Sequence, residues 1–516
     1  MNGFAWLTTL GVLPLLGGVV VAALPRGREL LAKQVALGVS LLVFAMTVVM
    51  ATRFSADSTA QFQFVEHHPW MSSFGVSYSV GVDGIALVLI AMATILVPIV
   101  ILAGWHEADG AKGQVKTFFA LILVLETMII GVFAATDVFL FYVFFEAMLI
   151  PVYFLIGSFG GAQRSYAAVK FLLYSLLGGL LMLAALIGVY VVSVHQRGTG
   201  TFEYAQLLGL HFTPSTEKWL FLGFFAAFAI KAPLWPFHTW LPDAAAESTP
   251  GTAVLLVGVL DKVGTFGMIR LCLPLFPHAS KYFTPVILVM SVIGILYGAL
   301  VAIGQTDMMR LIAYTSLSHF GFITLGIFAM TSQGQSGSTL YMVNHGFSTA
   351  GLFIIGGFLV SRRGSRLIAD YGGVQRVAPL LAGVFLVMGL ASLALPGLSS
   401  FVSEFLVLVG TFTRYPAYAV LATLGIVLAA IYVLFWYQRV ATGPATEHVK
   451  GFRDLGGREM LAVVPLVALI VALGFFPKPL LDVINPAVSR TLHEVGQTDP
   501  TPPVRVAQTA SEGITK

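Results

Sequence analysis

Residues 219–241 read WLFLGFFAAFAIKAPLWPFHTWL, an apolar stretch interrupted by Lys231, Pro233 and Pro236. About 20 apolar residues are enough to cross a bilayer as a helix. Two prolines within one turn remove backbone donors and break that helix. A membrane tolerates such a break only where it is buried in protein or lines a wet cavity. The stretch therefore predicts a protein with several membrane spans packed around a polar centre.

The composition of the whole chain agrees with a membrane protein. Of its 516 residues, 57% are hydrophobic and 10% are charged, whereas a soluble domain has about 25% charged residues. The net charge of +4 is not gathered into a long basic run, so nucleic acid is not an expected partner. The single cysteine, Cys272, can form neither an iron–sulfur cluster nor an internal disulfide. We therefore expect no cofactor and no metal on this chain.

Apolar stretches of similar length recur along the chain and predict about fourteen transmembrane helices. Lys and Arg in the connecting loops fall mostly on one side of the membrane when the N-terminus is placed outside. Because positive charge favours the inner side, both termini are predicted to lie on the outer side. The predicted spans are 4–24, 30–51, 80–103, 116–135, 137–158, 167–194, 219–241, 251–273, 283–303, 309–330, 338–360, 377–412, 416–438 and 460–477.

A second interruption, at Pro396 and Gly397, lies within the stretch 377–412, which is too long for one straight span. Each break falls in the fourth helix of a group of five, and an odd number of spans inverts the second group. This predicts two inverted five-helix repeats with broken seventh and twelfth helices, a plan of many transporters; two unrelated proline kinks are the alternative. The predicted all-α membrane fold has three N-terminal spans in 1–115, repeats at 116–273 and 283–440, a loop and last span in 441–477, and a loose polar tail at 478–516.

Charged side chains inside the predicted spans are the main candidates for function. Each costs roughly 2.5–3.5 kcal/mol at the centre of a membrane helix, so they must face the protein interior and find partners. A buried lysine changes its proton affinity with the position of nearby carboxylates, so such groups can pass protons; ion pairs that only dock helices are the alternative. The five are Glu126, Glu146, Lys231, Lys262 and Glu404.

Other ionisable residues extend this set. His238 follows the first break, and His319 and His345 lie on the spans 309–330 and 338–360. A polar stripe on membrane helices more often joins helices by hydrogen bonds than conducts protons, so both interpretations stay open for each histidine. Asp261 adjoins Lys262 and is a possible modulator of it, although neighbours on a helix point in different directions.

Several motifs of this chain resemble those of the antiporter-like subunits of respiratory complex I, the proton-pumping NADH:quinone oxidoreductase. The resemblance covers most of the chain and is strongest over 115–415. It is closest to the M-type subunits, because Glu404 stands where the L and N types and the related multisubunit antiporters tend to carry lysine. The motifs are FFEAMLIP at 144–151, KAPLWPFHTWLPDA at 231–244, KVGTFG at 262–267, RLIAYTSLSH at 310–319, LPG at 395–397 and FVSEF at 401–405.

The resemblance implies roles for these residues. Glu146 and Lys231 would form an input pair, Lys262 and the histidines a central relay, and Glu404 the outlet. The secondary members of the relay would be His319, His345, His238 and Glu126. It implies a proton translocase subunit in a bacterial plasma membrane, in contact with lipid, flanked by L-like and N-like subunits, with flavin and iron–sulfur centres on other subunits. A cation/proton antiporter subunit and a non-conducting membrane scaffold are the rival hypotheses.

Three residues depart from the family pattern. Ala245 stands where the family often has histidine, and Met309 stands where it often has lysine. Asp261 replaces the usual aliphatic residue before the central lysine. The resemblance therefore predicts that the electrostatic field around Lys262 differs in this chain.

Overall fold

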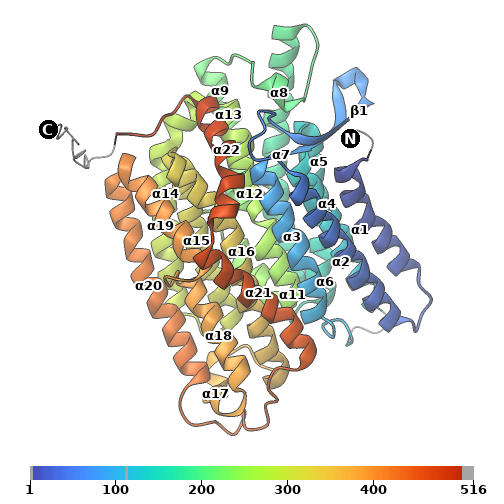
Figure 1. The fold of residues 1–516 in the computed structure, drawn as a ribbon, viewed down its shortest axis with the longest axis vertical. Coiled ribbons are helices and arrows are strands. Elements are labelled where there is room, and N and C mark those ends of the chain that lie inside the picture. The colour runs from blue at the N-terminus through green and yellow to red at the C-terminus, as the bar shows by residue number, and fades with distance from the viewer. Residues whose placement is uncertain (1–3, 111–113, 502–516) are drawn as a thin grey trace, which may run out of the picture.

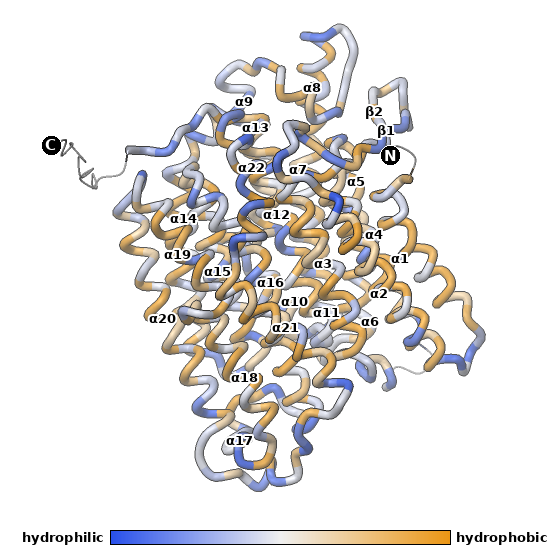
Figure 2. Tube along the Cα trace, viewed as in Figure 1, coloured by the Kyte–Doolittle hydropathy of each residue, from blue (hydrophilic) through white to orange (hydrophobic). Residues whose placement is uncertain are grey.

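The computed structural model describes residues 4–110 and 114–501. Long helices lie side by side and run between two ends of the molecule (Figure 1). Hydrophobic residues follow the helices, whereas hydrophilic residues gather mostly at the two ends (Figure 2). Among the described residues, twelve helices are long and apolar enough to cross a membrane. The predicted helical membrane architecture is therefore confirmed for most of the chain.

The N-terminal part contains one feature that the sequence did not predict. Two strands, β1 (Gln63–Met71) and β2 (Val76–Val82), form an antiparallel hairpin before the third span, with Gln63 opposite Val82. The hairpin lies at the same end of the molecule as the start of the first helix (Figure 1). The helices of this part are α1 (Trp6–Ala23), α2 (Glu29–Arg53) and α3 (Gly84–Ala103).

The first predicted repeat contains two interrupted spans. Pro151 has no N–H to bond the carbonyl of Ala147, and the fifth span divides at Met148. Pro233 and Pro236 end the seventh span at Lys231, and it resumes at Trp240. The helices are α4 (Val115–Ala134), α5 (Val138–Ala147), α6 (Leu149–Phe159), α7 (Arg164–Arg197), α8 (Tyr204–Leu207), α9 (Pro214–Lys231) and α10 (Trp240–Glu247).

The eighth span, Pro250–Leu275, is buried in the bundle except at the partly exposed residues Pro250 and Arg270. It alternates between α-helix and the wider π-helix, a change that is frequent at functional sites. Its segments are α11 (Pro250–Ala253), the π-helix η2 (Val254–Leu260), α12 (Lys262–Gly267), the π-helix η3 (Met268–Cys272) and α13 (Leu273–Leu275).

The second predicted repeat has its break at the expected place. Helix α18 ends at Ser392 and α19 begins at Ser399, with Pro396 and the left-handed Gly397 (φ 93°) between them. The two broken spans, α9–α10 and α18–α19, are not among the twelve, so the count of fourteen crossings and the inverted repeat stay predictions. The remaining helices are α14 (Pro277–Ile303), α15 (Met308–Ala329), α16 (Ser332–Arg363), η4 (Ile368–Asp370), α17 (Val374–Val377), α18 (Pro379–Ser392), α19 (Ser399–Arg414), α20 (Pro416–Ala441) and α21 (Gly457–Phe475).

The predicted loose tail at 478–516 is wrong for residues 478–495, which form α22 (Lys478–Val495). This helix packs against α3 and α16. Its composition is too polar for a span, yet one face is apolar, which suits a helix lying on the bundle. Residues 502–516 of the predicted tail lie outside the described residues. The buried face consists of Ile484, Ala487, Val488, Thr491, Leu492 and Val495.

Candidate functional site

Lys262 makes the most direct contact between predicted site residues. Its Nζ donates a hydrogen bond to the carbonyl of Val257 (2.7 Å) and lies 2.7 Å from Nδ1 of His345. An ammonium only donates, so Nδ1 accepts, and Nε2 of His345 carries the ring proton. That N–H lies 3.0 Å from Oγ of Ser316. The network therefore assigns a neutral His345 between α12 and α15.

His319 continues this series toward Glu404. The rings of His319 and His345 lie 5.2 Å apart between centroids. Tyr341 donates to Oε2 of Glu404 (2.8 Å), and Nδ1 of His319 lies 3.1 Å from the same hydroxyl. Because the tyrosine proton is used by Glu404, Nδ1 of His319 donates. Nε2 of His319 then accepts from Tyr432 at 3.2 Å.

These contacts form a buried series that we call the central relay: Lys262, His345, His319, Tyr341 and Glu404. All five side chains are buried. The structure brings together four residues that were predicted from sequence, and it adds Tyr341. The two tyrosines, Tyr341 and Tyr432, were missed, because a tyrosine in a membrane helix has many uses and no spacing ties either of them to Glu404.

Lys231 lies at the end of α9 without a hydrogen bond on Nζ. Its ammonium faces the rings of Phe145 (5.2 Å) and Phe171 (5.5 Å), an arrangement that favours a cation. Glu146 and Asp261 both act on it electrostatically. No ion pair or hydrogen bond joins Lys231 to either carboxylate. The predicted input pair is therefore close but unbonded in this structure.

Glu146 is held by its contact with α7. Its Oε1 atom accepts no hydrogen bond, and the carboxylate fills the space that a side chain on Gly179 would occupy. Only glycine at position 179 leaves room for the carboxylate where it stands. The pair Gly178-Gly179 thus serves close packing on two sides, since Gly178 approaches Ala227 of α9.

Three predicted residues stand apart from the central relay. Asp261 is fully buried and neither of its oxygens accepts a hydrogen bond. Glu126 on α4 is also fully buried, and neither of its oxygens accepts a hydrogen bond. His238 lies beyond the first break, edge-on to Tyr297 with centroids 5.2 Å apart. No hydrogen bond or ion pair connects Glu126 or His238 to the relay.

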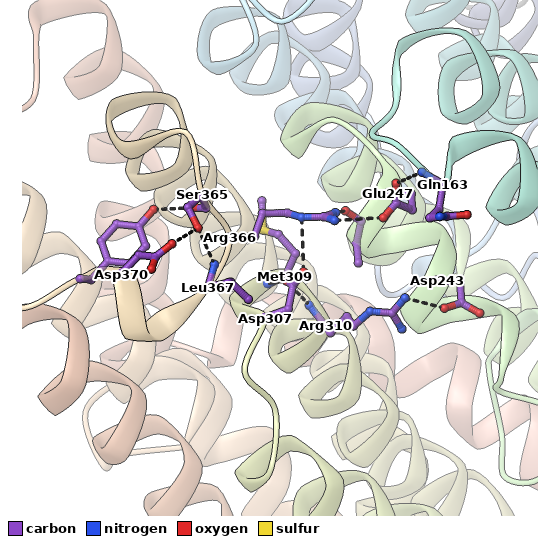
Figure 3. Close-up of polar contacts among 12 residues, drawn as sticks. Gln163, Asp243, Glu247, Asp307, Met309, Arg310, Ser365, Arg366, Leu367 and Asp370 are labelled. Atoms are coloured by element: carbon purple, nitrogen blue, oxygen red, sulfur yellow. Dashed lines mark hydrogen bonds and ion pairs between the residues drawn. The ribbon is translucent and has the colours of Figure 1, made fainter. Parts of the chain in front are cut away.

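Ion pairs join α10 to the second repeat at one end of the bundle. Asp243 accepts from Lys170 of α7 and from Arg310 of α15, both at 2.7 Å. Arg366 lies between Glu247 of α10 (3.0 Å) and Asp307, the N-cap of α15 (3.3 Å) (Figure 3). This ion-pair network holds the downstream half of the broken seventh span. The sequence contained Asp243 and Arg310 within its motifs but gave no indication that they touch.

Glu107 lies in the turn after α3, at the start of the eighth span. The backbone N–H of Gly251 donates to its Oε1 at 2.9 Å. Burial raises the pKa of Glu107 to about 7, against the opposing effect of hydrogen bonds from Thr249 and Gly251. A carboxyl group that titrates near neutral pH therefore caps the span that carries Lys262.

The chain is similar over most of its length to known proteins. The family described as NADH:quinone oxidoreductase/Mrp antiporter, TM, matches residues 135–431. NADH-quinone oxidoreductase subunit M of Mycobacterium tuberculosis is 55% identical, over 98% of this chain and 97% of the relative.

Two solved structures share the fold. A chain of respiratory complex I from Thermus thermophilus is 32% identical, with a TM-score of 0.86 over 95% of this chain and 100% of that chain. A chain of the Mrp complex from Dietzia sp. is 21% identical, with a TM-score of 0.82 over 95% and 100%, and shows the fold alone. The chain therefore belongs to the NADH:quinone oxidoreductase/Mrp antiporter family, among the subunits M of NADH-quinone oxidoreductase.

Proposed function

We propose that this chain translocates protons through its midplane residues as the M-type membrane subunit of an NADH:quinone oxidoreductase. The observation that carries the proposal is the buried series from Lys262 through His345, His319 and Tyr341 to Glu404, which is joined by hydrogen bonds except between the two histidines, whose rings are in contact. A scaffold needs paired charges, but it has no need of alternating donors and acceptors. Proton transfer needs them, because each group must accept one proton and release another.

The input side lies at the first break. Glu146 and Lys231 are close without being bonded, so a small movement changes how strongly the carboxylate stabilises the ammonium. When the carboxylate approaches, Lys231 holds its proton. When the carboxylate withdraws or is itself protonated, Lys231 releases the proton toward Lys262.

The output side lies after the second break. A proton on Lys262 passes to His345, crosses to His319, and reaches Glu404 through the hydroxyl of Tyr341. His345 takes the incoming proton on Nδ1 and gives up the one on Nε2 to Oγ of Ser316, which lies one turn from His319 on α15. The imidazole thus returns to a neutral state by changing tautomer. The contact between Tyr341 and Glu404, at 2.8 Å, makes the last transfer.

Membership of this complex also defines which redox centres, subunits and membrane surround the chain. Electron transfer takes place on flavin and iron–sulfur centres of other subunits, since this chain has one cysteine. L-like and N-like subunits flank it in a bacterial plasma membrane, with both termini on the outer side. The start of α1 and the end of α22 lie toward the same end of the bundle (Figure 1), which supports termini on one side.

The test uses the intact complex in proteoliposomes, with NADH and quinone supplied. We expect Lys231→Ala to abolish most of the NADH-driven proton uptake while the complex still assembles. The matched control is Lys478→Ala, which removes an exposed lysine paired with Asp482 on α22. Uptake at the native rate in the Lys231 variant would contradict the proposal. Sodium flux driven by a pH gradient would instead favour the antiporter.

A further inference from the structure

Neighbouring residues of the eighth span face different partners. Gly264 packs so tightly against α9 that an added Cβ would lie 2.6 Å from the Ala232 nitrogen and the Phe228 oxygen. Residues three apart on a helix share a face, so Asp261 is directed toward the same region of α9, where Lys231 ends the helix. The close approach at Gly264 therefore brings Asp261 beside the input pair.

Lys262 points elsewhere, because successive residues of a helix are rotated by about 100°. Its Nζ reaches His345 on α16 and the ring of Phe320 on α15, 5.1 Å away. Asp261 thus faces the first repeat while Lys262 faces the second. The electrostatic interactions of Asp261 agree with this placement, because its carboxylate is attracted by both Lys231 and Lys262.

The Asp261 carboxyl group is not locked into either ion pair. It is fully buried, and neither oxygen accepts a hydrogen bond from the protein. A carboxylate that serves only as a fixed counter-ion is stable in such a place when it is directly hydrogen-bonded to its cation. An unbonded carboxyl group between two lysines can instead exchange protons with each of them in turn.

We propose that Asp261 is a proton-carrying residue that passes protons from Lys231 to Lys262, an inference that rests on the proposed function. The cycle starts with Lys231 charged, Asp261 ionised and Lys262 neutral. The Lys231 ammonium gives a proton to the carboxylate, which leaves a neutral amine and a carboxylic acid. The acid then protonates the Lys262 amine, and the carboxylate is regenerated. Net charge is the same before and after, and one proton has moved from the first repeat to the second.

Leucine at position 261 fills the buried space of Asp261 with a side chain that carries no proton. We therefore expect Asp261→Leu to slow NADH-driven proton uptake about a hundredfold, at the lower end of what a positioned acid–base group contributes. Asp261→Asn keeps the size and should be equally slow, because an amide carries no proton. Asp261→Glu should restore at least half of the native rate.

The experiment compares these variants in the intact complex in proteoliposomes, with quinone reduction and proton uptake followed together. The infrared difference spectrum recorded during turnover gives a readout that a structural role would not change. We expect a carboxylic acid band that the native complex shows and that Asp261→Asn lacks. Asp482→Asn, at an exposed position on α22, is the matched control and should leave both the rate and the spectrum unchanged.

The outcomes separate the two proposals. Native proton uptake in Asp261→Leu together with loss of uptake in Lys262→Ala would overturn the role of Asp261 and leave the proposed function standing. Native uptake in both variants would overturn the proposed function itself. Slow uptake in Asp261→Leu with full rescue by Asp261→Asn would reduce the role of Asp261 to packing and hydrogen bonding, which also contradicts the inference.

Discussion

Nζ of Lys262 and Nδ1 of His345 lie 2.7 Å apart, between the eighth span and α16. This contact crosses from the first predicted repeat to the second and is the only direct bond between a buried lysine and a buried histidine in the part of the chain that the structure describes. This contact fixes the tautomer of His345, because the ring nitrogen that faces Lys262, Nδ1, must accept a hydrogen bond. The two nitrogens of one imidazole thus face opposite sides of the junction.

The first prediction concerns His345. His345→Ala leaves Lys262 bonded only to the carbonyl of Val257, with no group to take its proton. We expect NADH-driven proton uptake to slow tenfold or more, in line with the loss of a positioned acid–base group. The control is His278→Ala, because the side chain of His278 is 85% exposed. Equal uptake rates in the two variants would remove His345 from the route.

The second prediction separates the two tyrosines around His319. Tyr341→Phe removes the hydroxyl that joins His319 to Glu404, whereas Tyr432→Phe removes a donor outside the direct path. Tyr341→Phe deletes two buried hydrogen bonds, one of them to the Glu404 carboxylate, whereas Tyr432→Phe deletes one. Because a hydrogen bond to a charged group contributes about 1.5–3 kcal/mol, Tyr341→Phe should be the less stable variant, and both uptake rates are compared per assembled complex. Proton uptake should fall about a hundredfold in Tyr341→Phe and much less in Tyr432→Phe. The reverse order of rates would place the outlet at Tyr432.

The third prediction uses the contact between Gly179 and Glu146. In Gly179→Ala the new methyl group occupies the present position of the Glu146 carboxylate, which must move and change its distance to Lys231. Proton uptake should fall while the complex still assembles. Gly11→Ala is the control, because nothing lies within 4 Å of a Cβ at that position of α1.

A rescue variant sharpens this test. Glu146→Asp shortens the side chain by one methylene and withdraws the carboxylate from Gly179. We expect uptake in the double variant Gly179→Ala, Glu146→Asp to exceed that in Gly179→Ala alone. If Gly179→Ala pumps at the native rate, the position of the Glu146 carboxylate has no influence on proton transfer.

Much of the fold could be predicted because the bilayer simplifies the problem. Hydrophobic length marks the spans, and prolines without N–H groups mark the breaks at 231–240 and 392–399. Helix α22 was missed because its apolar residues lie on one face of a polar segment. The β1–β2 hairpin was missed because its strands show no regular alternation of buried and exposed residues.

The candidate site, too, could be predicted only in part from the sequence. Charges inside an apolar span stand out, so Glu146, Lys231, Lys262 and Glu404 could be named from the sequence. Which of them touch depends on how the helices pack. No hydrogen bond joins the predicted pair of Glu146 and Lys231, whereas an unpredicted hydroxyl on Tyr341 joins the relay. A tyrosine hydroxyl carries no charge, so it leaves no comparable mark on hydropathy.

The fourth prediction concerns the ion-pair network on α10. Asp243→Asn removes the charge that both Lys170 and Arg310 share at 2.7 Å, and hydrogen bonds to charged groups contribute about 1.5–3 kcal/mol each. The apparent unfolding temperature of the detergent-purified complex should drop. Glu447→Gln, which disturbs the exposed pair with Lys450, should leave it unchanged. Equal unfolding temperatures would mean that the network adds nothing to stability.

The last prediction concerns pH. Burial raises the pKa of Glu107 from 4.5 to about 7, so the folded chain keeps this proton where the unfolded chain has lost it. Stability rises with pH only where the unfolded state binds more protons, and here the folded state does. The contribution of Glu107 is therefore largest below pH 4.5, falls as the pH rises to about 7, and is constant above that.

Glu107→Gln should flatten the change in unfolding temperature between pH 4.5 and 7. Asp109, in the same turn, is the matched control. Burial alone would raise its pKa, but hydrogen bonds from Lys33 and His106 lower it below 3.8. Asp109→Asn should therefore shift the unfolding temperature by the same amount throughout the window. A pH profile that keeps its slope in Glu107→Gln would show that another group titrates there, because glutamine at position 107 has no proton to lose.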